Sequence, residues 1–216
     1  MEWALLGLGI LFLIVAFIMV QGTRAALAWR TAAERGDVNV IRDIADDAIS
    51  VWRSIKRPKE VPSDVWRGVQ SMQLVEVGPD FVHVSCRAES AYNLLAGRWI
   101  ETANALEGGM AITARVADML FYELPHFKPE RIQIDVYISF QQADGSSQRV
   151  CILSTITTRE AARRVDWEEW TPSQIVDELG ARYRLDDRGQ PLPIEVEPPT
   201  APAEVSGDNA AATAAS

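Results

Sequence analysis

Side chains capable of acid–base or metal chemistry are few in this sequence, and their spacing predicts no catalytic site. The two histidines are His83, on the polar side of an alternating segment, and His126, which follows Pro125. Neither has a second histidine, a cysteine or a carboxylate at the spacing of zinc ligands. Cys86 and Cys151 lie in separate apolar segments without a C-x-x-C pair. We therefore expect neither a metal nor a cofactor, and two unpaired buried thiols.

Motifs for nucleophilic catalysis and phosphate binding are also missing. The sequence has no G-x-S-x-G elbow, and the glycines between residues 95 and 109 lack the loop order of a nucleotide site. Asp135 follows a helix on a strand, which invites comparison with metal-dependent nucleases. Residues 150–157 supply neither further carboxylates nor the lysine that such a site needs. We interpret Asp135 as an outward-facing residue of an amphipathic strand and expect no enzymatic activity.

The charge balance argues against nucleic-acid partners. The formal net charge is −9, and Glu195, Glu197, Glu204 and Asp208 in the last segment contribute four of these charges. Binding to a phosphate backbone rests on neutralisation by lysine and arginine. We therefore expect no nucleic-acid binding.

The most specific feature is an unbroken apolar run over residues 3–20. Its 18 residues give about 27 Å of helix, close to the ~30 Å hydrocarbon core of a bilayer. Trp3 and Trp29 lie near its ends, where indole rings favour the membrane interface. A cleaved signal peptide is the alternative, because residues 26–28 (Ala-Leu-Ala) resemble a cleavage site. Against it, Glu2 precedes the run without Lys or Arg, and the run is long for a signal peptide.

The charges around this predicted transmembrane helix indicate its orientation. Arg24, Arg30 and Arg35 follow it, whereas only the α-amino group offsets Glu2 before it. The positive-inside rule then places the N-terminus outside the cell membrane and the domain in the cytoplasm. Unpaired cysteines agree with a reducing compartment.

Hydrophobic periodicity predicts an α+β fold in which helices pack on a mainly antiparallel sheet. Helices are expected over residues 40–55 and 105–124. Because Gly108 and Gly109 lie in the first turn of the second helix, a start after these glycines is the alternative. Strands are expected over residues 69–77, 81–89, 131–140 and 150–157, with a further pair within 91–102. The last two long strands are joined at Asp144-Gly145, a hairpin signal. We expect the strands to form a meander with helices on one face.

Two short helices are predicted after the strands. Thr157 and Glu160 have the spacing of a capping box. Thr171, Pro172 and Gln174 begin a second helix, which Gly180 closes.

The chain therefore divides into four segments. Residues 1–30 form the anchor and its flank, residues 31–60 a juxtamembrane amphipathic helix, residues 61–190 the α+β domain, and residues 191–216 a disordered acidic tail rich in Pro and Ala. Within that tail, Ile194 and Val196 can still add a short strand or bind a partner.

Two groups of surface residues are candidate contact sites. Arg53, Lys56, Arg57 and Lys59 form a basic cluster that suits anionic lipid headgroups, at about 1 kcal/mol per residue; the alternative is a solvated helix end. Trp167 and Trp170, at i,i+3 spacing, are candidate protein-interface anchors; the alternative is that they cap the core.

The resulting functional hypothesis is a membrane-anchored, non-enzymatic interaction or assembly module. Its partners are the lipid bilayer, through residues 3–20, and another protein or a second copy of the chain. One alternative is an accessory subunit of a larger membrane complex. Another is a small-ligand-binding or enzymatic domain, which a polar pocket around His83, Arg87 or Tyr137 would favour and a solid apolar core would exclude.

Overall fold

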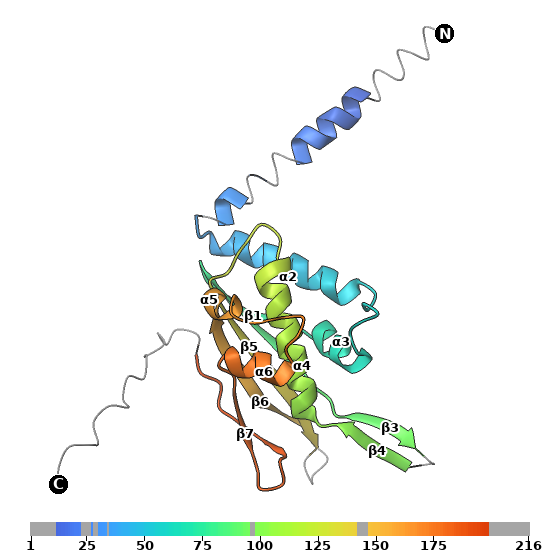
Figure 1. Ribbon diagram of the computed structural model, residues 1–216. Coiled ribbons are helices and arrows are strands. Elements are labelled where there is room, and N and C mark those ends of the chain that lie inside the picture. Colours follow the sequence, from blue (N-terminus) through green and yellow to red (C-terminus); the bar gives the residue numbers. More distant parts are fainter. Residues whose placement is uncertain are drawn as a thin grey trace, which may run out of the picture.

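The computed structural model describes residues 12–22, 27, 30–33, 35–95, 98–141 and 147–198 (Figure 1). Residues 12–22 are helical and lie away from the sheet. Eight large hydrophobic side chains between Phe12 and Val20 are 47–73% exposed. In the described part of the chain, no helix is both long enough and apolar enough to cross a membrane. Residues 3–11 of the predicted anchor lie outside that part.

A six-stranded mixed sheet forms the centre of the domain, so the predicted α+β class is confirmed. Its strands lie in the order β1 (Gln73–Val77), β2 (Phe81–Arg87), β5 (Arg131–Gln141), β6 (Ser147–Thr158), β7 (Arg182–Leu185) and β8 (Pro191–Leu192). Every neighbouring pair is antiparallel except β2 and β5, which are parallel. The predicted meander is therefore wrong at the middle of the sheet. A parallel pair needs a long crossover, and the chain between these two strands supplies it.

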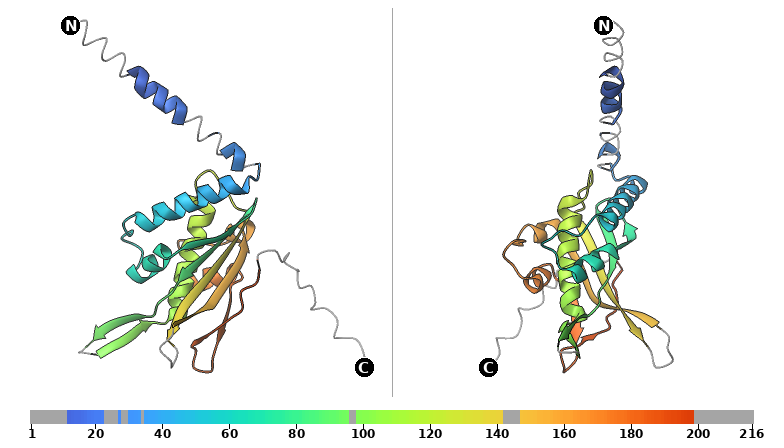
Figure 2. Two further views of the ribbon diagram at one scale, coloured as in Figure 1. Left: turned by 180° about the vertical axis from the view of Figure 1, so that it is seen from behind. Right: turned by 90° about the vertical axis from the view of Figure 1, so that its right-hand side faces the viewer.

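That crossover contains a separate hairpin and helix α4 (Ala105–Asp118). Strands β3 (Ala91–Leu95) and β4 (Arg98–Ala103) pair only with each other among the described strands. The expected strand pair within residues 91–102 is thus confirmed. Figures 1 and 2 show that it projects beyond the end of the main sheet.

Helices α2 (Val38–Ser54), α3 (Ser63–Gln70) and α4 (Ala105–Asp118) contribute to one core with the sheet. The Asp37 side chain caps α2 by accepting from the Asn39 backbone N–H at 3.0 Å. Helix α4 starts at Ala105, as predicted. The alternative start after its two glycines is wrong, because Asn104 and Glu107 form a capping box that begins the helix before them. Gly109 lies against β5, where an added Cβ would be 3.3 Å from Val136 Cγ1.

The C-terminal turn of α4 widens into a π-helical turn, η1 (Met119–Glu123), before Pro125. Two short helices follow the sheet, α5 (Arg159–Ala162) and α6 (Pro172–Glu178). Thr158, not Thr157, caps α5, accepting from the Ala161 N–H at 3.3 Å. The predicted start of α6 at Thr171 and Pro172 is confirmed, and Thr171 forms a capping box with Gln174.

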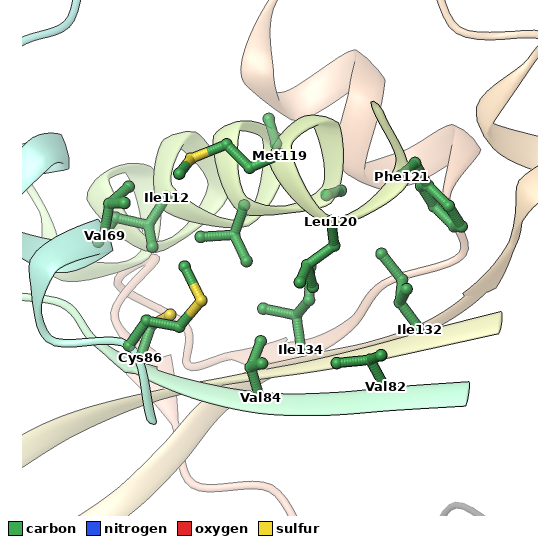
Figure 3. Packing of buried hydrophobic residues seen from close by; sticks show 14 of the residues in the cluster. Val69, Val82, Val84, Cys86, Ile112, Met119, Leu120, Phe121, Ile132 and Ile134 are labelled. Carbon is green, nitrogen blue, oxygen red and sulfur yellow. The ribbon is translucent and has the colours of Figure 1, made fainter. Parts of the chain in front are cut away.

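The core lies between α4 and the inner face of the sheet (Figure 3). Alternate residues of β2 and β5 point toward the helix, among them Val82, Val84, Ile132 and Ile134, all with no exposed surface. Ile112, Met119 and Leu120 meet them from α4 and η1. Because strand side chains alternate between faces, the intervening residues must lie on the opposite face.

Candidate functional site

The face of the sheet opposite α4 carries a group of buried polar residues; it faces the viewer in the left panel of Figure 2. His83 comes from β2, Gln133 and Asp135 from β5, and Ser154 from β6. Pairing of β2 with β5 sets His83 beside Gln133, and pairing of β5 with β6 sets Asp135 beside Ser154. All four residues are at most 6% exposed. Buried polar side chains of this kind need partners.

Asp135 is the centre of this polar cluster, which we define as His83, Gln133, Asp135 and Ser154. Its Oδ2 lies 2.6 Å from Nε2 of His83, and its Oδ1 accepts from the Ser154 hydroxyl at 2.6 Å. The Gln133 amide donates to both oxygens at 3.4 Å. Asp135 lies on the outward face of its strand, as predicted, but it is buried there, because this part of that face is covered.

The hydrogen bonds define what the polar cluster can do chemically. A carboxylate only accepts, so Nε2 of His83 donates to Asp135, and the imidazole is held by its acidic partner. Ser154 also donates to Asp135, whereas an activated serine would be bonded to the imidazole. The arrangement therefore contains an oriented histidine but no serine–histidine pair. Its hydrogen bonds fix the orientation of these side chains, and its polar atoms can contact a polar ligand.

Two buried atoms of the polar cluster have no hydrogen-bond partner within the described residues. They are Nδ1 of His83 and Oε1 of Gln133. A buried polar atom without a partner is unfavourable compared with a satisfied one. These two atoms are available to an additional hydrogen-bonding group.

The cover over the polar cluster is a C-terminal segment, residues 193–198, which we call the strap. The Ile194 N–H donates to the backbone oxygen of Cys151 on β6 at 2.9 Å. Further along, the Gln133 amide donates to the backbone oxygen of Glu197 at 3.0 Å. These two contacts lie on neighbouring strands on either side of Ser154, so the strap crosses the polar face between them. The sequence assigns these residues to the tail, and the tail beyond 198 lies outside the described residues.

A groove of about 800 Å³ separates the strap from β7. It is lined by Arg182, Tyr183 and Arg184 on one side and by residues 193–198 on the other. One ion pair, between Arg182 and Glu197, bridges the two sides. Ile194 and Val196 are half-buried, whereas Glu195 and Glu197 between and after them are exposed.

Arginine and aromatic side chains border the polar cluster at the other end. Arg149 donates to the Ser85 hydroxyl at 3.2 Å, and its guanidinium lies 4.2 Å from the centre of the Tyr137 ring. Burial raises the pKa of the Tyr137 hydroxyl above its usual value. Cys86 and Cys151 are free and buried, as expected. Burial raises the pKa of each thiol to about 12.

The predicted basic cluster is exposed. Arg53 lies in the last turn of α2, and Lys56, Arg57 and Lys59 follow in the link to α3, at the end of α2 remote from residues 12–22 (Figure 1). Arg57 donates to the backbone oxygen of Val61 at 2.5 Å. Contact of this cluster with lipid stays a prediction.

The two predicted interface tryptophans are half-buried and pack against the core. The Trp167 indole donates to the backbone oxygen of Ala162 at 3.2 Å and meets the Tyr122 ring edge-on at 5.9 Å. This packing of Trp167 and Trp170 favours the core-capping interpretation, and a role at a protein interface stays a prediction.

The second histidine lies elsewhere, in a loop beside a smaller hollow. His126 has a φ of 60° and lines a cavity of about 430 Å³ with Arg30, Asp80 and Lys128. Within the described ranges, no group of three or more His, Cys, Asp or Glu is placed to hold a metal ion. Comparisons with models of protein families, with curated proteins and with solved structures find no match.

The polar cluster is the candidate site. The sequence named His83 and the nearby Tyr137 as surroundings of a polar pocket, but it did not predict the cluster around Asp135. The alternation of apolar and polar residues placed both His83 and Asp135 on the polar face of a strand. A signal was available in the pattern, since an acid, an imidazole and an amide share one face of two strands. The pairing of those strands, about 50 residues apart, was not predicted.

Proposed function

We propose that this chain is a membrane-anchored, non-enzymatic interaction module whose α+β domain lies on the cytoplasmic side. The observation that carries the proposal is the exposure of eight large hydrophobic side chains between Phe12 and Val20. Contiguous exposed apolar surface of this kind is unfavourable in water and is typical of a membrane or protein contact. Together with residues 3–11, these residues complete the apolar run of the sequence.

The flanking charges support the orientation. Arg24, Arg30 and Arg35 follow the apolar run, and cytoplasmic flanks carry an excess of such residues. The exposed basic cluster at Arg53, Lys56, Arg57 and Lys59 is at the far end of α2 from residues 12–22. It meets anionic headgroups when α2 lies along the bilayer surface.

The test of anchoring is extraction of membranes with alkaline carbonate. We expect the full-length chain to stay in the membrane pellet, and a variant without residues 3–20 to be released. The matched control keeps residues 3–20 and replaces Arg53, Lys56, Arg57 and Lys59 with Gln; it should remain in the pellet. Release of the full-length chain by carbonate contradicts membrane anchoring.

The test of the interaction role is recovery of the chain from detergent-solubilised membranes at its native level. We expect a complex larger than the monomer, recovered by pull-down and sized on native gels. A bare monomer contradicts an interaction module. The full-length chain should be compared with a variant whose residues 1–30 are replaced by an unrelated anchor.

The same anchor-replacement variant distinguishes the proposed module from the second candidate function, an accessory subunit of a larger membrane complex. Eight large hydrophobic side chains between Phe12 and Val20 are exposed, so this helix has a surface for lateral contact with other membrane helices as well as with lipid. Replacement of the anchor then abolishes co-migration with the complex. If the domain alone makes the contact, co-migration survives the replacement.

A further inference from the structure

We propose that the strap occupies a binding site for an extended acidic segment of a partner protein, and that strap and partner exchange on the outer face of the sheet. The proposal builds on the interaction role above, because it names the surface and the class of partner. It is independent of membrane anchoring.

The strap is itself held as an extended peptide ligand is held. Its Ile194 N–H bonds to a backbone oxygen of β6, and its Glu197 backbone oxygen accepts from the Gln133 side chain. Peptides that add to a sheet are recognised in this way, through main-chain hydrogen bonds plus alternate side chains. The site therefore recognises backbone atoms that any extended segment can supply.

The side chains of the strap define the chemistry of the partner. Ile194 and Val196 of the strap, and Leu192 just before it in β8, are half-buried. Glu195 and Glu197 are exposed. Across the groove, β7 presents Arg182 and Arg184, and Glu197 pairs with the first of these. The matching ligand is an extended segment with apolar residues at every second position and carboxylates between them.

The strap is a loosely held occupant of this site. Its ion pair with Arg182 is about half exposed, at 46% for the arginine and 52% for the glutamate, and exposed pairs of this kind contribute little. A groove of about 800 Å³ remains between strap and β7. Nδ1 of His83 and Oε1 of Gln133 find no partner in the described structure. A partner that supplies one further donor or acceptor to these atoms is a better ligand than the strap.

The test uses a fluorescent peptide with the sequence of residues 191–198, PLPIEVEP, added to the detergent-solubilised protein. We compare the full-length chain with a variant that ends after Leu192, reading binding by fluorescence anisotropy. Because the tethered strap competes at a high effective concentration, the full-length chain should bind at least about 10-fold more weakly. Equal binding by the two chains overturns the proposal, since the peptide then binds elsewhere.

A charge exchange tests the placement of the peptide. Arg182→Glu in the shortened chain should weaken binding, and a peptide with Arg in place of Glu197 should restore it. Arg188→Glu, on the exposed turn after β7, is the matched control and should leave binding unchanged. Loss of binding without restoration by the altered peptide contradicts the proposed site.

A second variant tests the proposal if the shortened chain does not fold. The full-length chain with Ile194→Asp and Val196→Asp keeps its length but loosens the strap, and it should bind the peptide more tightly than the unaltered chain. If neither variant binds, the proposal is wrong. A full-length dimer that disappears on shortening identifies a second copy as the occupant and also overturns it. Failure of anchoring in the carbonate test leaves these readouts unchanged.

Discussion

His83 and Asp135 lie on two adjacent parallel strands, with Nε2 of the imidazole 2.6 Å from Oδ2 of the carboxylate. Their side chains are 7% and 1% exposed. The pair therefore connects the two halves of the domain, the segment before α4 and the segment after it, through a polar contact in a largely apolar fold.

Removal of the carboxylate from this pair should destabilise the domain. Asp135→Ala leaves the imidazole and the Ser154 hydroxyl buried without their acceptor, so we expect a loss of about 3 to 5 kcal/mol in the free energy of unfolding. Urea denaturation of the full-length chain in detergent measures it. Asp46→Asn, on the exposed face of α2, is the control and should change the free energy by less than about 0.5 kcal/mol.

A double-mutant cycle isolates the contact itself. Because His83→Ala and Asp135→Ala remove opposite ends of one hydrogen bond, their effects should not add, and we expect a coupling energy of about 1 to 3 kcal/mol. Additive effects would show that the two residues stabilise the sheet independently of each other.

The packing of α3 on α4 should be intolerant of a single methyl group at Gly68. A Cβ at this position would overlap with Cδ1 of Ile112. It would also lie 2.5 Å from Cγ1 of Ile112 and 3.1 Å from the backbone oxygen of Arg87. Gly68→Ala should therefore reduce the free energy of unfolding by about 1 to 3 kcal/mol. The matched control is Gly108→Ala in α4, where the nearest atom is 3.5 Å away; better helix propensity should raise stability by roughly 0.5 to 1 kcal/mol. An unchanged free energy of unfolding in Gly68→Ala would contradict the close contact.

Arg159 should be sensitive to replacement by lysine. Its guanidinium donates to the backbone oxygens of Pro129 and Phe121, at 3.0 and 2.9 Å, and so satisfies a carbonyl in the π-helical turn η1. Lysine keeps the charge but cannot supply both donors in this geometry. We expect Arg159→Lys to lower the free energy of unfolding by about 2 kcal/mol, and Arg163→Lys on the exposed surface to change it by less than about 0.5 kcal/mol. Equal effects of the two substitutions would exclude this role.

The two thiols should be unreactive in the folded protein. Burial raises the pKa of Cys86 and of Cys151 to about 12. The reactive thiolate is therefore scarce at pH 8, and labelling by a disulfide reagent should be on the order of 10³-fold slower than for a free thiol of pKa ~8.5. The rate should keep rising with pH toward 12. Unfolding in urea should release both thiols, whereas rapid labelling of the native chain at pH 8 would contradict their burial.

Much of the local structure could be predicted from the sequence, because it depends on neighbouring residues. Apolar spacing predicted α2, and the cap at Thr171 with Pro172 predicted the start of α6. The start of α4 at Ala105 was also predicted, although the capping box of Asn104 and Glu107 that stabilises it was not.

The candidate site could be predicted only in part, because it depends on contacts that are distant in sequence. Alternation placed Asp135 on the outer face, but it could not show that the strap covers that face. The strap has the composition of a disordered tail, and its seating depends on Cys151 and Gln133, which are remote in the chain. The parallel pairing of β2 with β5 was missed for the same reason.

That parallel pair also determines when the domain can fold during synthesis. Phe81 is paired with Arg131, so β2 waits for about 50 residues of further chain, several seconds at ribosomal rates of about 5–20 residues per second. During that interval one edge of β2 has no strand to pair with, and such edges promote association between chains. Pairing with β5 then closes that edge, so association through β2 is restricted to the interval before β5 is made.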